Sequence, residues 1–302
     1  MSKRKKGPNH KLDHAPFLVK PGGGFRFADH DTAYTADLAD KKAGKAALLE
    51  DIRDLSEAQQ LLWADGRHSV LIILQAMDAA GKDGAIRHVM SGVNPQGIDV
   101  HAFKAPSEEE RKHHFLWRPS RFLPAKGRIA IFNRSYYEEV LVVRVHPKFL
   151  DGQFRSERIA RRPLSKIWKA RYAAINRFEE TLAGDDMLIL KFFLNVSKDE
   201  QKRRFLARLD DPAKNWKFSA GDLRERAHWP DYMRAFREML AATSTEHAPW
   251  YVIPADNKWF ARAAIADIIA TRIGNLPLSP PKPTPEQLAG LDQARKDLLG
   301  GA

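Results

Sequence analysis

The stretch SVLIILQAMDAAGKDG, residues 69–84, decides the expected fold. Its first seven residues form an apolar run of strand length, and the other nine form a loop that leads into an apolar helical face including Ala85 and Val89. Where a buried strand turns into a helix, backbone N–H groups and the positive end of the helix dipole converge, which suits phosphate. Lys82 adds a positive charge at that point. The stretch therefore predicts a phosphate-binding loop.

This loop differs from the common P-loop pattern at two positions. Ala76 stands where the first glycine is usual, and Asp83 stands where Ser or Thr usually holds magnesium. A Gly-Lys pair after a strand also occurs in ordinary turns. The loop by itself therefore leaves phosphate binding and a plain turn about equally open.

Composition limits the classes of protein to consider. With 302 residues, 43% of them hydrophobic, the chain can bury a full core, and the absence of cysteine excludes disulfides, a thiol nucleophile and a cysteine-bound metal. The chain has neither an apolar run of membrane-spanning length nor a secretory signal, so we expect a cytoplasmic protein without membrane partners. Fifty Lys and Arg against 38 Asp and Glu give a net charge of +12, which suits a polyanion or simply a basic, soluble surface.

Strand-like and helical segments alternate along most of the chain. Four further apolar runs lie at residues 98–103, 128–132, 187–196 and 250–253, each separated from the next by helical sequence. This alternation predicts an α/β fold with a parallel five-stranded sheet and flanking helices. Ligands are then expected at the carboxyl ends of the strands.

The same pass along the chain suggests three parts. Residues 1–30 read as a flexible basic tail, and residues 31–275 as a P-loop domain with N-terminal helices and a helical lid at about 210–247. Residues 276–302 read as a proline-rich linker and a C-terminal helix. The leucines of that helix could cover the chain's own core or a second subunit.

Polar residues follow the strand at 128–132. Its carboxyl end carries Asn133 and Arg134, at a point where P-loop enzymes normally hold an aspartate for magnesium. Because Asn133 is neutral, a metal there needs Asp78, Asp83 or Glu138 as an anionic ligand. Asp78 is the first candidate, and capping of the loop is the alternative role for its side chain.

Phosphoryl transfer requires positioning and positive charge, which favours cations gathered at strand ends. Arg134 and Lys82 are best placed, and a solvated surface is the alternative for the remaining cations. We predict phosphate or substrate contacts from Ala79, Ala80, Gly81, Asp83, Gly84, Arg87, Lys104, Arg118, Arg121, Asn133, Glu138, Lys191, Arg204 and Arg208.

Several segments taken together resemble the polyphosphate kinase 2 family. They lie at residues 78–84, 103–107, 115–118, 132–138 and 142–146, and residues 210–218 look like that family's lid segment. The resemblance implies a thymidylate-kinase-like P-loop fold. It also implies reversible phosphoryl transfer between inorganic polyphosphate and AMP or ADP, with GMP and GDP as further candidates. Mg²⁺ is the implied cofactor, with Mn²⁺ as a substitute, and the implied assembly is a homodimer or homotetramer.

The resemblance also assigns roles to residues. It places Asp78 and Lys82 in the Walker A loop, Asn133 and Arg134 in the Walker B region, and Arg204 and Arg208 at the lid base. We therefore expect Asp78, Lys82 and Arg134 to be catalytic.

We expect the metal ligands to be Asp78, Asn133 and Glu138. The residues at Ala76, Asp83 and Asn133 resemble the subclass that phosphorylates both mono- and diphosphates. Relatives that prefer diphosphates resemble Asp and a non-acidic residue at positions 133 and 138. Our hypothesis is that Glu138 helps hold magnesium when the acceptor is a monophosphate.

Two other functions compete with this interpretation. An ATP-dependent nucleotide kinase would share the fold and differ in its phosphoryl donor. A nucleic-acid-binding P-loop protein would account for the charge of +12. The sequence contains no recognisable nucleic-acid-binding module, so we expect no nucleic-acid partner.

Overall fold

The computed structural model describes residues 12–22, 24–153, 156–213 and 215–300. Its centre is a five-stranded sheet in the order β2-β3-β1-β4-β5, in which every neighbouring pair is parallel. The strands are β1 (Ser69–Gln75), β2 (Ile98–Ala102), β3 (Ile129–Asn133), β4 (Met187–Asn195) and β5 (Trp250–Pro254). The apolar runs predict all five, so the expected α/β sheet is confirmed. β1 is buried along its length because it is the central strand.

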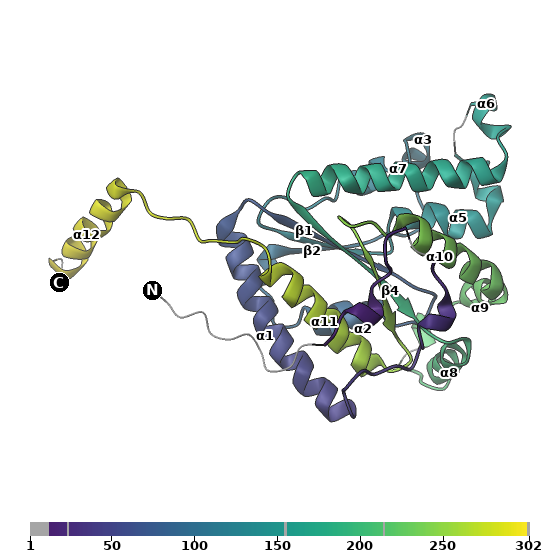
Figure 1. Ribbon diagram of the computed structural model, residues 1–302, viewed down its shortest axis with the longest axis horizontal. Coiled ribbons are helices and arrows are strands. Elements are labelled where there is room, and N and C mark those ends of the chain that lie inside the picture. The colour runs from purple at the N-terminus through teal and green to yellow at the C-terminus, as the bar shows by residue number, and fades with distance from the viewer. Residues whose placement is uncertain (1–11, 23, 154–155, 214, 301–302) are drawn as a thin grey trace.

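Helices cover both faces of this sheet (Figure 1). One face carries α1 (Lys41–Asp65), α2 (Lys82–Val89) and α11 (Lys258–Gly274), which pack together. The other carries α5 (Val142–Val145), α7 (Leu164–Gly184) and α10 (Trp229–Thr243). The remaining helices are α3 (Glu108–Lys112), α4 (Trp117–Ser120), α6 (Glu157–Ala160), α8 (Lys198–Leu209), α9 (Ala220–Ala227) and α12 (Pro285–Gly300). Short 3₁₀ turns are η1 (Ala15–Phe17), η2 (Phe27–Asp29), η3 (Pro95–Gly97), η4 (Tyr136–Val140), η5 (Pro147–Leu150) and η6 (Asn215–Lys217).

The described part of the N-terminal segment packs against the sheet. Phe17 and Val19 are buried, and the Val19 N–H donates to Trp250 O at 2.9 Å, so this segment covers the outer edge of β5. The prediction of a flexible tail over residues 1–30 is therefore wrong from residue 12 onward. A few apolar side chains are enough to anchor a segment that is otherwise rich in loop residues. Residues 1–11 lie outside the described residues.

The expected lid divides into two parts. α9 has no buried residue, whereas α10 buries Tyr232, Phe236 and Met239 in the core. The prediction of a lid at 210–247 is therefore wrong for α10, which is a core helix with one apolar face. A lid role for the segment up to α9 stays a prediction.

The C-terminal helix α12 forms where the sequence predicts it and projects away from the sheet and its covering helices (Figure 1). None of its residues is buried, and Leu288, Leu291, Leu298 and Leu299 are all exposed. It therefore does not cover the core of its own chain.

This architecture brings the carboxyl ends of the parallel strands to one edge of the sheet. Leu74 of β1 pairs with Asn133 of β3, so the loop after β1 and the polar turn after β3 begin side by side. Among the described residues, no helix has both the length and the apolar character needed to span a membrane.

Candidate active site

The loop after β1 has the backbone of an anion-binding turn. Ala79 and Gly81 adopt positive φ values of 60° and 112°, and Gly81 is the residue that precedes α2. A side chain at Gly81 would be strained, because φ of 112° lies in the region that L residues rarely adopt. The loop and the first turn of α2 line a cavity of about 910 Å³. This arrangement fits the predicted phosphate loop, although phosphate binding itself stays a prediction.

Lys82 is buried at the start of α2 and folds back over the loop. Its Nζ donates to Ala76 O at 3.0 Å and to Met77 O at 3.4 Å. An ammonium group has three donors, so one N–H is left for a phosphate oxygen. Burial lowers the pKa of Lys82, with a smaller contribution from the neighbouring Arg134 charge, while nearby carboxylates oppose the shift. The charge is thus held in a site that an anion would stabilise.

Arg134 extends from the turn after β3 into the same cavity. Its Nη2 donates to Asp78 Oδ1 at 2.8 Å, and its Nη1 lies 3.8 Å from Glu138 Oε2. The two carboxylates raise the pKa of Arg134, Glu138 more than Asp78, against an opposing effect of burial. The structure therefore brings together the three residues that we expect to be catalytic, Asp78, Lys82 and Arg134.

Asn133 and Asp83 face each other across the opening between the loop and β3. The Asn133 carboxamide donates to Asp83 Oδ1 at 2.6 Å, and both residues line the large cavity. Sequence comparison with the common P-loop singled out both positions as departures. In the structure these two residues form a hydrogen bond with each other.

Glu138 is half-buried beside Arg134 and lines the smaller cavity. In the amide orientation that satisfies its partners, Gln75 donates to Glu138 Oε1 at 3.0 Å and accepts from the Ser135 N–H at 3.0 Å. Burial raises the pKa of Glu138, and the positive charges of Arg134 and Lys82 partly oppose that shift. Gln75 is a site residue that the sequence analysis missed, because it is the last residue of an otherwise apolar strand.

Arg204 does not have the predicted role. Its Nε donates to Glu200 Oε1 at 2.6 Å, its Nη1 to the carbonyls of Ala79 and Ala80, and its Nη2 to those of Ala255 and Asp256. These bonds use all five N–H donors of the guanidinium, which is buried. Arg204 lines the large cavity, but its donors are all used to brace the phosphate loop, so the prediction that it binds phosphate is wrong.

A second brace connects the loop to α9. Gln201 of α8 donates to Asp78 O at 2.9 Å and accepts from Arg226 Nη1 at 2.8 Å. Arg208 lines the large cavity, where its Nη1 lies 3.7 Å from Asp222 Oδ2 of α9. Burial and the nearby Asp78 charge raise the pKa of Asp222. Asp222 thus adds a carboxylate from the expected lid that the sequence analysis did not identify.

Three further cations line the large cavity. Within the described ranges, no hydrogen bond or ion pair involves the side chains of Arg87, Lys258 or Arg262. Burial and the charges of Arg204, Arg203 and Arg262 lower the pKa of Lys258 to about 8. Lys258 and Arg262 were missed, although they stand four residues apart just after β5 and therefore share one helix face at a strand end.

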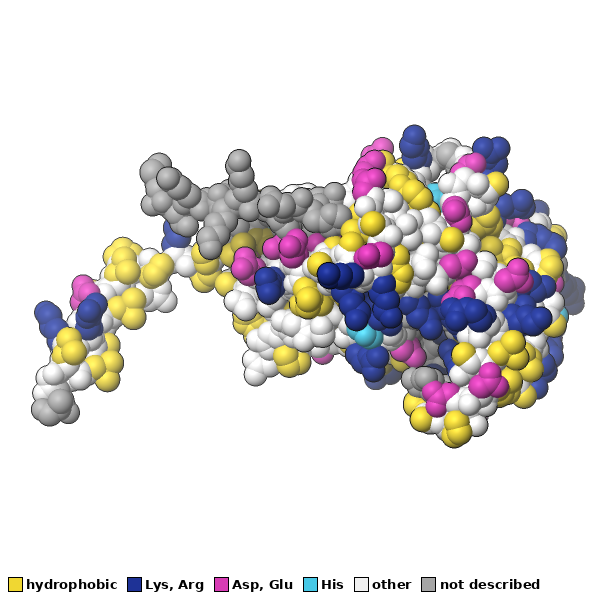
Figure 2. Space-filling model, turned by 90° about the horizontal axis from the view of Figure 1, so that it is seen from below, with side chains coloured by type: hydrophobic (Ala, Val, Ile, Leu, Met, Phe, Trp, Pro, Cys, Tyr) yellow, Lys and Arg dark blue, Asp and Glu magenta, His cyan; other side chains and the backbone are white. Residues whose placement is uncertain are grey.

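Positive charge also extends over the surface. Figure 2 shows Lys and Arg side chains in a band across one face of the molecule. Part of the charge excess is therefore gathered in one continuous strip instead of being spread evenly.

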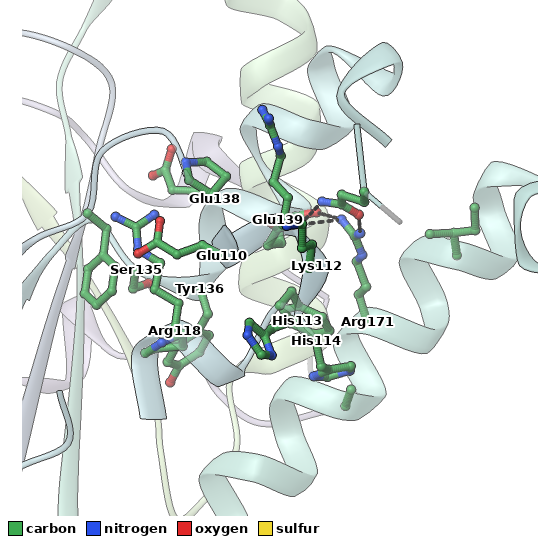
Figure 3. Close-up of a pocket in the computed structure, with 18 of the residues that line it drawn as sticks. Glu110, Lys112, His113, His114, Arg118, Ser135, Tyr136, Glu138, Glu139 and Arg171 are labelled. Carbon is green, nitrogen blue, oxygen red and sulfur yellow. Dashed lines mark hydrogen bonds and ion pairs between the residues drawn. The ribbon is translucent and has the colours of Figure 1, made fainter. Parts of the chain in front are cut away.

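A second cavity of about 570 Å³ is lined in part by Ser135, Glu138 and Glu139 of the turn after β3 (Figure 3). Its walls include the rings of Phe103 and Phe115, and its polar groups include Glu110 and Arg118. Arg118 donates to Lys104 O at 2.8 Å, pairs with Glu110 at 3.0 Å and lies 5.0 Å from the centre of the Phe103 ring. Lys104 and Phe103 line both cavities, so the two meet beside the turn.

Two further predicted phosphate ligands lie elsewhere. The Arg121 guanidinium lies over the Trp117 ring, 4.8 Å from its centre, and lines neither cavity. Lys191 is fully buried in β4, where its Nζ bonds to Glu179, Tyr137 and Thr243. The prediction for Lys191 is wrong because its side chain points into the core beneath the sheet. The structure likewise does not bring Arg121 to the site.

Comparison with known proteins supports one family. The sequence profile described as Polyphosphate kinase 2 matches residues 38–276. The chain is 52% identical over 254 residues to an ADP-polyphosphate phosphotransferase of Rhodopseudomonas palustris, covering 83% of this chain and 86% of that protein. It is 44% identical over 271 residues to an AMP/ADP-polyphosphate phosphotransferase of Meiothermus ruber, covering 88% and 95%.

A solved structure agrees with these sequence matches. The crystal structure of Polyphosphate Kinase 2 from Arthrobacter aurescens TC1 superimposes with a TM-score of 0.84 at 41% identity, covering 95% of this chain and 99% of that one. The profile spans the whole sheet and both cavities. On the sequence matches and the shared fold, the chain belongs to the polyphosphate kinase 2 family.

Proposed function

We propose that the protein is a polyphosphate-dependent nucleotide kinase that transfers a phosphoryl group reversibly between inorganic polyphosphate and AMP or ADP. The observation that carries this proposal is a pair of cavities that share Phe103 and Lys104, with Arg134 lining the large cavity and Glu138 the smaller one. One is lined by the phosphate loop and cations, and the other by aromatic and polar side chains. A polyanionic donor and a nucleotide acceptor can therefore approach one point from opposite sides.

The donor belongs in the large cavity. The loop amides, Lys82 and Arg134 would hold its terminal phosphates, while Arg87, Lys258 and Arg262 would hold units farther along the polymer. These last three cations form no ion pair among the described residues, so an anion would relieve their mutual repulsion. A long polyanion uses such a row of charges better than a compact nucleotide does.

The acceptor belongs in the smaller cavity. An aromatic wall with a few polar groups is typical of a site for a nucleobase and ribose. The acceptor's terminal phosphate oxygen would attack the terminal phosphorus of polyphosphate in line, and the bond to the next phosphate would break. Phosphate oxygens are ionised near neutral pH, so no protein base is needed, and Arg134 and Lys82 neutralise the developing charge.

Two residues support a proposal for which nucleotides accept the phosphoryl group. Asn133 and Glu138 match the pattern of the subclass that uses both mono- and diphosphates, which supports AMP and ADP, with GMP and GDP as further candidate acceptors. The Meiothermus ruber relative is named for both AMP and ADP, and the Rhodopseudomonas palustris relative for ADP.

The carboxylates present fit a divalent cation. Asp78 and Glu138 both approach Arg134, and Mg²⁺ typically uses one or two carboxylates together with substrate phosphates and water. Within the described ranges there is no group of three metal-binding His, Asp or Glu side chains, which agrees with a cation held largely by substrate. We propose Mg²⁺, with Mn²⁺ as a substitute, near Asp78, Asn133 and Glu138. When bound, it would neutralise phosphate charge and orient the reacting groups.

The decisive experiment is an assay of nucleotide products from the purified protein with Mg²⁺. AMP and ADP are each supplied with long-chain polyphosphate, and ATP plus AMP serves as the control. We expect ADP and ATP to form from AMP only when polyphosphate is present, and chelation by EDTA to stop the reaction. Turnover with ATP alone would instead support an ATP-dependent nucleotide kinase. Salt-sensitive nucleic-acid binding without turnover would support the third alternative.

A further inference from the structure

A buried ionic network lies behind the turn that carries Arg134 and Glu138. Glu179 of α7 and Lys191 of β4 form an ion pair with 2.6 Å between Oε2 and Nζ, and neither side chain is exposed. Neither residue lines either cavity, so neither would touch a substrate. An ion pair of this kind recovers its desolvation cost only when further hydrogen bonds satisfy it.

Those further bonds come from two consecutive tyrosines of η4. The hydroxyls of Tyr136 and Tyr137 each donate to Glu179 Oε1 at 2.7 Å. Lys191 Nζ also donates to Tyr137 OH at 2.9 Å and to Thr243 O at 2.6 Å. Burial raises the pKa of both tyrosines, so their hydroxyl protons remain in these bonds at physiological pH. Glu179 is thus a common acceptor for the residues that immediately precede Glu138.

The turn they anchor has a strained backbone. Arg134 adopts φ of 64°, a left-handed conformation that is unfavourable for a residue with a β-carbon. Such a conformation persists only when the surrounding structure holds it. Local bonds contribute, since the Arg134 N–H donates to Leu74 O and the Tyr137 N–H donates to Ser135 Oγ. The tyrosine hydroxyls add an anchor on α7 and β4, outside the turn itself.

We propose that Glu179 is a positioning residue for phosphoryl transfer. With Lys191 as its counter-ion, it holds Tyr136 and Tyr137, and through them it fixes the turn so that Arg134 and Glu138 face the point where the two cavities meet. Loss of this anchor lets the turn relax away from the left-handed conformation. The cations that bind the distal part of the donor lie on α2 and α11 and are not disturbed.

The test uses Tyr136→Phe and Tyr137→Phe, each of which removes one hydroxyl and keeps the ring. Tyr136 lines the smaller cavity and Tyr137 lines neither, so Tyr137→Phe is the decisive variant. Both variants should fold, as judged by circular dichroism and thermal melting. In both, kcat should fall by about tenfold or more, because a small misplacement of catalytic groups is costly. The KM for long-chain polyphosphate should stay unchanged, and the ratio of AMP to ADP turnover should shift as Glu138 moves.

Two additional variants separate positioning from packing. Tyr172→Phe is the matched control. Tyr172 lies on α7, its hydroxyl accepts from Arg144 at 2.8 Å, and it lines neither cavity, so kcat of the variant should equal that of the wild type. The double variant Glu179→Leu with Lys191→Met removes both buried charges together, and with them the acceptor of the tyrosine hydroxyls. It should be as stable as, or more stable than, a variant of either residue alone, yet have a low kcat.

Wild-type kcat in folded Tyr136→Phe and Tyr137→Phe variants would overturn the proposal, whether or not the double variant folds. An equal loss of kcat in Tyr172→Phe would also overturn it. The proposal rests on the proposed function for its assay, so the wild type is measured in parallel. A wild type that turns over ATP but not polyphosphate would count against the donor assignment, and the same variants would then test positioning with ATP.

Discussion

At the scale of single residues, a few carboxylates and carbonyl oxygens hold the positive side chains of the site in place. Arg134 is bound by Asp78 and lies close to Glu138, while Lys82 is bound to loop carbonyls. Each cation is therefore held in place before any substrate binds, which reduces the reorganisation needed during transfer. Arg204 shows the contrasting case, because a residue of the same type has all of its donors engaged by the protein and acts as a brace.

Glu138 offers a prediction at this scale. Because burial raises its pKa, the carboxyl becomes neutral at a higher pH than an exposed glutamate, and its charge is lost as the pH falls through that raised value. Glu138→Gln imitates the neutral form. In this variant we expect AMP turnover to fall about tenfold relative to ADP turnover, equivalent to about 1.4 kcal/mol. The rate with AMP should also no longer decrease as the pH falls.

The measurement is the rate with each acceptor between mildly acid and neutral pH. Asp99→Asn is a suitable control, since Asp99 of β2 forms an ion pair with Arg128 and lines neither cavity. An unchanged ratio of AMP to ADP turnover in Glu138→Gln would refute the role of Glu138 in using monophosphates.

At the scale of elements, the site is built where helices begin beside strand ends. α2 begins at the phosphate loop after β1, and α11 begins after β5, so Arg87 and the pair Lys258 and Arg262 approach the large cavity from two helices. α8 supplies the braces to the loop, and α9 supplies Asp222. Binding of the donor and support of the phosphate loop are thus carried out by different helices.

Lys258 provides the prediction for this scale. Its pKa of about 8 means that its charge is present below that pH and is lost above it. We expect kcat/KM for long-chain polyphosphate, which reports the unliganded enzyme, to fall as the pH rises above about 8. Lys258→Arg should keep its kcat/KM at high pH, because arginine stays charged. Lys258→Met should have a low kcat/KM at every pH. A wild-type pH profile in Lys258→Met would contradict the assignment.

At the scale of the whole molecule, α12 is the exception to an otherwise packed chain. The linker before it is held at its start, because the Ser279 N–H donates to Asp65 Oδ1 at 3.0 Å. The helix beyond it buries nothing and presents four leucines to solvent. A helix of 16 residues is marginal in water without a packing partner. The expected homodimer or homotetramer remains a prediction, and α12 is the element that we expect to take part.

The corresponding experiment measures oligomer mass by light scattering after size-exclusion chromatography. Leu291→Glu combined with Leu298→Glu should lower the mass toward that of a single chain. Ala289→Glu, on the opposite side of the helix, should not change it. An assembly of unchanged mass in the double variant would show that α12 is not the contact.

The sequence by itself determined the sheet and the centre of the site. Residues 69–84 form a strand, a loop and a helix through local apolar spacing and glycine, and strand ends in a parallel sheet must meet, so Asp78, Lys82 and Arg134 could be assigned together. Only the tertiary structure decided what each remaining cation does. Arg204 and Lys191 are buried against carbonyls and a carboxylate from distant segments, and Lys258 lines the large cavity without an ion-pair partner among the described residues. Burial and hydrogen-bond partners depend on segments far apart in the chain, so residue type and spacing cannot reveal them.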